Sequence, residues 1–331
     1  MVLVLPFAIR QVEHNLELFF FAMGVAAVSV TGAWSTRLVF DALYHPIPIT
    51  SAVLGVGLVF HFGRRAGDRY FRAAQARMPA SLLYFLIVVL LGLASSLITA
   101  IIAALILSEI IHLLRIGRRQ EVRLAVIACF AIGLGAALTP LGEPLSTIVI
   151  VKLKADFWYL ARLIGLYIIP GVAALGLLAA RIKPEHGSSL PSDSFRHDPL
   201  PAVFTRAAKV FAFVAALLLL GEGLTPLVDR YLVKLSAPLL FWVNTISAVL
   251  DNATLAAAEV SRSLSGEQLV AILLGLLVSG GMLIPGNIPN IICANHLRIR
   301  SREWAAVGVP LGAVLLVVYF ATWFFIGRYF P

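Results

Sequence analysis

The residues TPLGEP at 139–144 and IPGNIP at 284–289 interrupt two long, mostly apolar segments at 124–152 and 267–297. Each interruption contains two prolines four residues apart. Proline lacks the backbone N–H that a helix interior uses, so each pair leaves carbonyl groups without partners and breaks the helix. The sequence therefore predicts two discontinuous helices.

The composition around these breaks is that of a membrane protein. Hydrophobic residues make up 60% of the 331 residues and charged residues only 13%, against about 25% charged in a typical soluble domain. The mean hydropathy is +0.94. Uncharged runs at 82–108, 124–142 and 305–327 reach the roughly 18–20 residues that cross a hydrocarbon core about 30 Å thick. We expect most of the chain to lie in the lipid bilayer.

Apolar runs bounded by charge predict the positions of the remaining segments. Ordinary crossing helices are expected at 16–34, 46–62, 157–179, 205–228 and 303–327. The stretch 81–115 is too long for one crossing and contains Ser95 and Ser96, while 235–258 contains Asp251 near its end. Both stretches are expected to form hairpins that enter and leave the membrane on one side.

Positive charge predicts the orientation. The connections at 61–80, 112–123, 181–209 and 296–304, together with Arg10, contain 18 of the 26 Lys and Arg residues. Such connections are usually cytoplasmic. This predicts a multi-pass protein of the prokaryotic inner membrane with a cytoplasmic N-terminus. The first hairpin then opens from the cytoplasm and the second from the outside.

The two halves of the chain then have opposite topology. Pro140 and Pro144 are spaced like Pro285 and Pro289, an offset of 145 residues. The predicted fold is an all-α polytopic membrane protein with inverted-topology repeats, each with a re-entrant or short hairpin and a broken transmembrane helix. The expected divisions are an N-terminal helix and loop at 1–45, a first repeat at 46–180, a cytoplasmic linker at 181–204 and a second repeat at 205–331.

Two acidic residues lie at the predicted breaks and hairpin tips. Glu143 is inside the first break, and Asp251 is in the second hairpin beside Asn252. A charged side chain at mid-membrane costs about 2.5–3.5 kcal/mol, so such residues usually have a function. We expect Glu143 and Asp251 to bind an ion and to couple it to protons, with Asp251 and Asn252 as ligands of a monovalent cation. The alternative is that each carboxylate caps a half-helix.

Neutral oxygen atoms near the same places are further candidate ligands. They belong to Ser95, Ser96, Thr139, Asn252, Thr254, Asn287 and Asn290. Hard cations favour such oxygens, although each could instead form hydrogen bonds between helices. Glu109, Glu222 and Glu259 lie near segment ends, where they could reach interfacial water, and are secondary candidates as proton carriers.

Other function classes find little support. No HExxH or GxSxG arrangement indicates an intramembrane enzyme, and the two cysteines form no metal-binding motif. No cofactor is expected beyond a transported cation and protons. The basic residues lie in short connections and not on one face, which argues against nucleic acid. The sequence does not determine the oligomeric state, and a homodimer is one possibility.

Three stretches give a resemblance to a known family: 130–148, NTISAVLDNATLAAAEV at 244–260, and 279–299. They resemble the signature blocks of an uncharacterised prokaryotic family of cation transporters. That family is similar to the ion transporter superfamily, which includes NhaD-type sodium/proton antiporters, arsenite permeases and dicarboxylate carriers. The resemblance implies that hairpin tips and helix breaks together bind sodium and substrate.

These observations predict a secondary active transporter for an inorganic cation, working by alternating access at mid-membrane. A sodium/proton antiporter is the leading interpretation, because an acidic hairpin tip with Asp251 suits a cation and not an organic anion. The alternative is a cation-coupled anion symporter or an arsenite-permease-like carrier, which the half-helix N-termini would favour.

Overall fold

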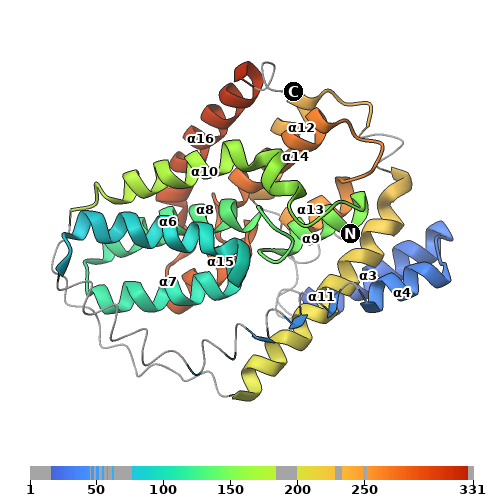
Figure 1. Cartoon of the computed structure of the whole chain (residues 1–331), viewed down its shortest axis with the longest axis horizontal. Helices are drawn as coiled ribbons and strands as arrows, with labels where there is room; N and C mark the ends of the chain where they lie inside the picture. The colour runs from blue at the N-terminus through green and yellow to red at the C-terminus, as the bar shows by residue number, and fades with distance from the viewer. Residues whose placement is uncertain are drawn as a thin grey trace.

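The computed structural model describes residues 16–44, 77–183, 200–227, 233–248 and 252–326, with a few positions between 46 and 62. Every regular element in these ranges is a helix (Figure 1). The chain begins with α3 (Leu16–Thr31) and α4 (Thr36–Tyr44). The first half of the remaining chain contains α6 (Ala80–Ile98), α7 (Ala100–Leu114), α8 (Arg118–Ala136), α9 (Pro144–Leu153) and α10 (Tyr159–Ala179).

Helix α11 (Leu200–Leu227) connects this first half to a second half. The second half contains α12 (Ala237–Val243), the 3-10 helix η2 (Asn244–Ala248), α13 (Asn252–Glu259), α14 (Gly266–Gly280), the short 3-10 helix η3 (Ile284–Gly286), α15 (Ile288–His296) and α16 (Ser301–Ile326).

Four of the described helices are long and apolar enough to cross a membrane: α6, α10, the part of α11 at Val203–Gly223, and α16. Several shorter apolar helices, including α7, α9 and α14, accompany them. The chain is therefore a helical membrane protein. Exposed Val314, Val317 and Leu90 on the outer helices are then lipid-facing.

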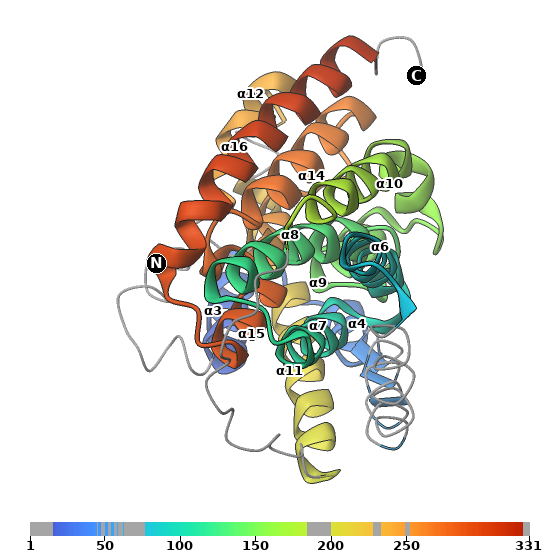
Figure 2. The same ribbon diagram turned by 90° about the vertical axis from the view of Figure 1, so that its left-hand side faces the viewer.

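Helices α8 and α14 form the centre of the molecule. Every residue from Leu124 to Ala136 and from Leu269 to Gly280 is buried. A helix that is apolar on all sides belongs in a core. Helix α8 contacts α6, α7, α10, α14, α15 and α16, and Figure 2 shows it surrounded by these helices.

Glycines allow the closest helix contact in the first half. A Cβ atom on Gly135 would lie 1.8 Å from the carbonyl oxygen of Gly92, so the backbones of α6 and α8 touch directly. Small residues commonly permit such approaches between membrane helices. Helices α6 and α7 form a hairpin that turns at Thr99, whose backbone has a positive φ of 75°.

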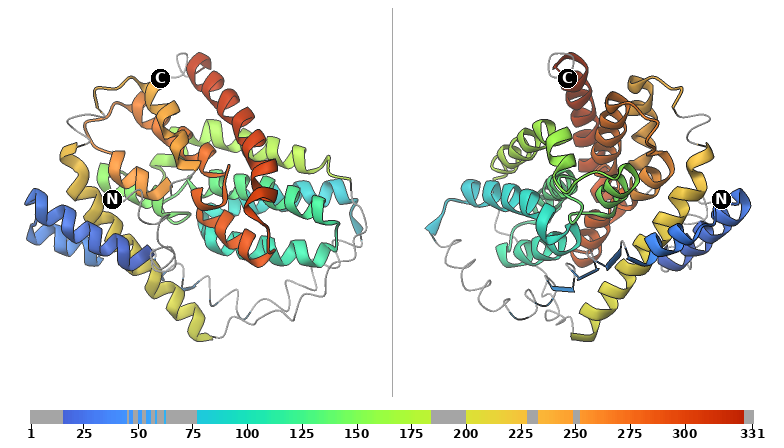
Figure 3. Two further views of the ribbon diagram at one scale, coloured as in Figure 1. Left: turned by 180° about the vertical axis from the view of Figure 1, so that it is seen from behind. Right: turned by 45° about the vertical axis from the view of Figure 1, so that its right-hand side comes forward.

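The two halves pack against each other through their short helices. Helix α7 lies beside α15, and α13 lies beside α9 (Figure 1). Helix α11 contacts both α13 and α9, and α3 packs along α11. Figure 3 shows α3 and α4 at the edge of the molecule, on the outer side of α11. Elements from both halves thus lie beside α9 and α15, the two helices that follow the breaks.

Most segments agree with the sequence-based predictions. Helices α10, α11 and α16 match three predicted crossings, and both predicted interruptions are present, at 137–143 and 281–287. The hairpin in 81–115 is also present, but its turn is at Thr99, and Ser95 and Ser96 remain helical within α6.

Two other boundaries differ. Helix α11 begins at Leu200, inside the predicted linker 181–204, because Pro201 is tolerated in a first helical turn. The crossing expected at 16–34 ends at Thr31, and the amphipathic helix α4 was not predicted. The predicted crossing at 46–62 lies mostly outside the described residues.

Candidate ion-binding site

The first helix break, at 137–143, is folded tightly. The N–H of Gly142 donates to the carbonyl of Thr139 at 3.2 Å, which closes a turn. A Cβ atom on Gly142 would lie 2.0 Å from the carbonyl oxygen of Ala136. The break therefore packs against the end of α8 and leaves no room for a side chain at this glycine.

The tip of the first hairpin is bound to this break. The N–H of Ala100 donates to the carbonyl of Gly142 at 2.8 Å. The Thr139 hydroxyl donates to the carbonyl of Ser96 and accepts from the N–H of Leu141 at 3.3 Å. Hairpin tip and break thus form one unit, and Thr139 is one of the residues that join them.

Ser95 and Ser96 are buried beside this unit. The Ser95 hydroxyl donates to the carbonyls of Gly92 at 2.6 Å and Ile132 at 3.0 Å, and the Ser96 hydroxyl donates to Leu93 at 2.7 Å. The contact with Ile132 joins α6 to α8. For Ser95 the helix-to-helix hydrogen bond is therefore present, and only its oxygen lone pairs remain for a ligand.

Glu143 occupies the N-cap position of α9, immediately before Pro144. It is 5% exposed, and its side chain makes no capping hydrogen bond. The alternative role as a capping side chain is therefore not seen in this geometry. A carboxylate at this place still faces the positive end of a helix dipole.

The second break, at 281–287, repeats the backbone of the first. Four backbone hydrogen bonds recur 144 residues later: those from Ala137, Leu138, Gly142 and Thr147 have counterparts from Gly281, Met282, Gly286 and Ile291. The N-cap residues also correspond, with φ and ψ of −154° and 160° at Glu143 and −153° and 146° at Asn287.

This structural offset differs by one from the 145 residues that the prolines suggested. The reason is that Pro144 is the first residue of α9, whereas Pro289 is the second residue of α15. Proline is acceptable at either position, since the first N–H groups of a helix have no partner within it. The structural counterpart of Glu143 is therefore Asn287.

Asn287 and Asn290 are buried at the second break. A Cβ atom on Gly133 would lie 2.5 Å from Asn287 Nδ2, so the Asn287 side chain reaches α8 of the other half. Asn290 Nδ2 donates to the carbonyls of Gly280 and Leu283, both at 2.9 Å, while its buried Oδ1 accepts no hydrogen bond. A free amide oxygen at a helix break is a suitable cation ligand.

The second hairpin is only partly described. Asn252 is the first residue of α13 and is 2% exposed, and its Nδ2 makes no hydrogen bond. Asp251 lies outside the described residues, as does the side chain of Thr254. The hydroxyl of Ser279 donates to the carbonyl of Asn244 at 2.9 Å, which fixes η2 to α14.

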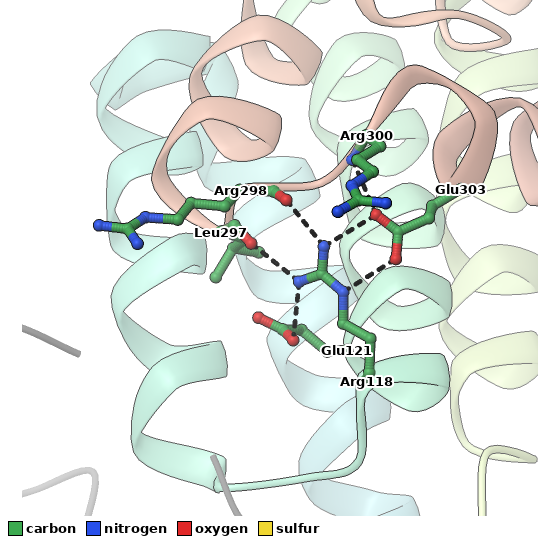
Figure 4. Close-up of polar contacts among 6 residues, drawn as sticks. All are labelled: Arg118, Glu121, Leu297, Arg298, Arg300 and Glu303. Atoms are coloured by element: carbon green, nitrogen blue, oxygen red, sulfur yellow. Dashed lines mark hydrogen bonds and ion pairs between the residues drawn. The ribbon is translucent and has the colours of Figure 1, made fainter. Parts of the chain in front are cut away.

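Arg118 links the two halves (Figure 4). Its guanidinium donates to Glu303 from Nε at 3.0 Å and Nη2 at 2.9 Å, and to Glu121 from Nη1 at 3.1 Å. It also donates to the carbonyls of Leu297 and Arg298, both at 2.8 Å. All five N–H donors are thus used, and the start of α8 is fixed to the connection between α15 and α16.

A smaller contact of the same kind lies 144 residues later. Arg262 Nε donates to the carbonyl of Lys152, at the end of α9, at 2.9 Å. Lys152 Nζ in turn donates to the carbonyls of Val260 at 3.0 Å and Gly221 at 3.2 Å. These bonds fix the end of α9 to α11 and to the residues that follow α13.

Two functional candidates have no strong sequence signal. Gly133 admits the Asn287 side chain, and the Asn244 amide lies close enough to the Glu259 carboxyl group to interact with it. The one sequence feature that could have indicated Asn244 is that it is an amide within an apolar run. Glu259 was expected to reach interfacial water but is 8% exposed, because α13 is enclosed by α9, α11 and α14.

Clusters of typical metal-ligating side chains give no further candidate ion site within the described residues. Within the described ranges, no group of three or more His, Cys, Asp or Glu residues could hold a metal ion. The oxygen-rich places are the two breaks and the hairpin tips. Such places suit weakly held monovalent cations better than a resident transition metal.

A family model described as "Protein of unknown function (DUF1646)" matches residues 1–326. The chain belongs to this family. No curated protein matches the chain. Since the match includes both breaks and both hairpins, the site lies wholly within the region that defines DUF1646, and its function is argued from its chemistry.

Proposed function

We propose that this DUF1646 protein is a secondary active transporter that exchanges a monovalent inorganic cation, sodium, for protons. The observation that supports it best is the recurrence of one backbone arrangement at 137–143 and 281–287. Two such breaks within opposed repeats are typical of secondary transporters whose site lies at mid-membrane. In this proposal, α6–α10 and α12–α16 are inverted repeats.

The arrangement of the arginine contacts supports opposite orientations of the two halves. Arg118 joins the connections at 112–123 and 296–304, both of which the charge distribution predicts to be cytoplasmic. Arg262 joins the end of α9 to the residues after α13, which the same prediction puts outside. Each contact thus connects two segments expected on one side of the membrane.

The breaks supply the groups that a dehydrated cation needs. Backbone carbonyls are exposed where helical hydrogen bonding stops, and unpaired carbonyls in a membrane are stable only beside protein or polar groups. The free Oδ1 of Asn290 lies at one break, and the Glu143 carboxyl group lies at the other. Asp251 immediately precedes Asn252 at the start of α13. Together they would form a site of oxygen ligands.

Coupling to protons follows from competition. A carboxylate must lose its proton before it binds a cation, so the two ions exclude each other at one site. Asp251 and Glu143 are the proposed coupling residues. Alternating exposure of the site to the two sides would then exchange sodium for protons.

The test is ion exchange in proteoliposomes that contain a pH-sensitive dye. External sodium should raise the internal pH, whereas choline should not. Asp251→Asn should abolish this response, because it preserves shape and removes the titratable charge. Glu267→Gln is a matched control, because Glu267 is exposed and has no proposed part in exchange. A wild-type response in Asp251→Asn would contradict the assignment.

Orientation can be tested separately with an impermeant thiol reagent in whole cells. In a variant lacking Cys129 and Cys293, Arg119→Cys should resist labelling and Ser263→Cys should react. Both positions are exposed, beside the Arg118 and Arg262 contacts respectively. Labelling in the opposite sense would contradict the proposed cytoplasmic side.

Cation-coupled anion uptake is the second candidate. Helix α15, with Asn287 at its N-cap, has no acidic residue in its first turn, and such an N-terminus attracts anions. Sodium-driven uptake of labelled dicarboxylate or arsenite, without sodium-dependent proton movement, would favour it.

A further inference from the structure

Glu259 is a buried acid that the proposed exchange site does not use. It is the last residue of α13 and is 8% exposed. A carboxylate at the C-terminal end of a helix faces the negative end of the helix dipole. Burial there also removes the water that would stabilise its charge. An ionised Glu259 would therefore need a cationic partner.

Among the residues that the structure describes, the charged groups around α13 do not provide that partner. From α9, the Lys152 ammonium donates to the carbonyls of Val260 and Gly221. From α11, Glu222 is exposed and has the same sign. Helix α14 has its only ionisable residue, Glu267, in its first turn. In the described part of η2 no residue is ionisable.

The polar side chain next to Glu259 is neutral. The Asn244 amide lies close enough to the Glu259 carboxyl group to interact with it, and its Nδ2 donates to the carbonyl of Leu240 at 2.9 Å. Asn244 is fully buried. Two oxygen atoms of this pair, Glu259 Oε2 and Asn244 Oδ1, are buried and accept no hydrogen bond. Each of these two acceptor oxygens therefore lacks a hydrogen-bond donor.

One proton accounts for both oxygens. We propose that Glu259 and Asn244 form a buried proton-binding site, in which Glu259 is protonated on Oε2 and donates to Asn244 Oδ1. The amide donates in return to the other carboxyl oxygen, so the two groups form a paired acid and amide. No buried charge then remains, and both orphaned acceptors are satisfied.

Glutamine is the natural mimic of this protonated acid. In Glu259→Gln the new amide can donate to Asn244 Oδ1 and accept from Asn244 Nδ2, as the protonated carboxyl group does. The variant should fold, and its melting temperature should equal or exceed that of the wild type. A variant that fails to fold or melts clearly lower would overturn the proposal, because an ionised Glu259 would then be the stabilising form.

Infrared spectroscopy of the purified protein reads the proton directly. At neutral pH, Glu259→Gln should lack one carbonyl-stretch band of a protonated carboxyl group, while the control Glu222→Gln keeps the wild-type spectrum. Asn244→Ala should retain the band at a higher frequency, because its hydrogen bond is lost. Identical spectra of wild type and Glu259→Gln would overturn the proposal.

A pH series gives a second readout. A proton bound in the folded state is lost as pH rises, so wild-type stability should fall from about pH 6 to about pH 9 more than that of Glu259→Gln. Equal pH dependence in the two proteins would contradict the proton site. None of these measurements involves transport, so the proposal can succeed or fail independently of sodium/proton exchange.

Discussion

The two helix breaks have the same backbone and different side chains. At corresponding positions 144 residues apart, Gly135 precedes the first break and Glu143 ends it, whereas Ser279 precedes the second break and Asn287 ends it. The turns and N-cap conformations agree within the scatter of ordinary helix ends. The shape of a break is thus independent of its charge, and one half can hold an acid where the other holds an amide.

The packing around the breaks differs in the same way. In the first half, Gly135 brings α8 into contact with the backbone of α6 at Gly92. In the second half, Ser279 instead makes a hydrogen bond from its side chain to the carbonyl of Asn244. One half uses the absence of a side chain and the other uses a polar one, so equal substitutions should have unequal effects.

The largest expected effect is on folding, and it comes from adding a side chain at Gly135; removing the hydroxyl at Ser279 should have a much smaller effect. Gly135→Ser would place a Cβ atom 1.8 Å from the Gly92 carbonyl oxygen, an overlap that costs about 3 kcal/mol or more. We expect no monodisperse protein on size-exclusion chromatography. Ser279→Ala loses one hydrogen bond, worth about 1 kcal/mol, and should remain folded. Equal yields of the two variants would contradict the comparison.

The next effect separates charge from shape at the N-caps. Glu143→Gln should lower sodium-dependent proton exchange by about tenfold or more, equivalent to about 1.4 kcal/mol, while its melting temperature is kept. Asn287→Asp adds a buried charge, which costs about 2.5–3.5 kcal/mol in a membrane, and should mainly lower the melting temperature. If Glu143→Gln exchanges ions normally, Glu143 is not a coupling residue.

A smaller effect is expected from the prolines. Replacing Pro140 and Pro144 together by alanine, or Pro285 and Pro289 together, should permit more continuous helix and reduce exchange several-fold without preventing membrane insertion. The single variant Pro144→Ala serves as a control, because a first helical position needs no N–H. Unchanged kinetics in both double variants would show that the prolines do not maintain the breaks.

The smallest effect compares the two arginine contacts. Arg118→Gln loses an ion-pair network with Glu303 and Glu121 that is partly exposed, so the loss should be about 1 kcal/mol. Arg262→Gln loses the hydrogen bond to the carbonyl of Lys152 and should cost less. Melting temperatures at low and high salt give the check, since only the Arg118 effect should shrink with salt. Equal effects at both salts would contradict this distinction.

Local chemistry explains which features could be predicted. The breaks at 139–144 and 284–289 follow from proline, and the apolar crossings follow from length and hydropathy. The turn at Thr99 could not be predicted from Ser95 and Ser96, because small polar residues are stable within a membrane helix when they donate to its carbonyls. Ser96 does this with Leu93.

Some residues of the candidate site could likewise be predicted from the sequence, and others could not. The sequence pointed to Glu143, Asn287 and Asn290 from their positions in the breaks, and the structure buries all three. It did not pair Glu259 with Asn244, because the contact joins different elements. Asp251 remains a prediction.

By itself, the sequence determined a helical membrane protein with two interrupted helices, since proline and apolar length act along the chain. Only the tertiary structure decided that the breaks correspond at 144 residues, that Asn287 reaches Gly133, and that Glu259 is buried beside Asn244. These features depend on how closely helices approach each other. Close approach is set by side-chain volume at contacts between residues far apart in the sequence, which no local pattern records.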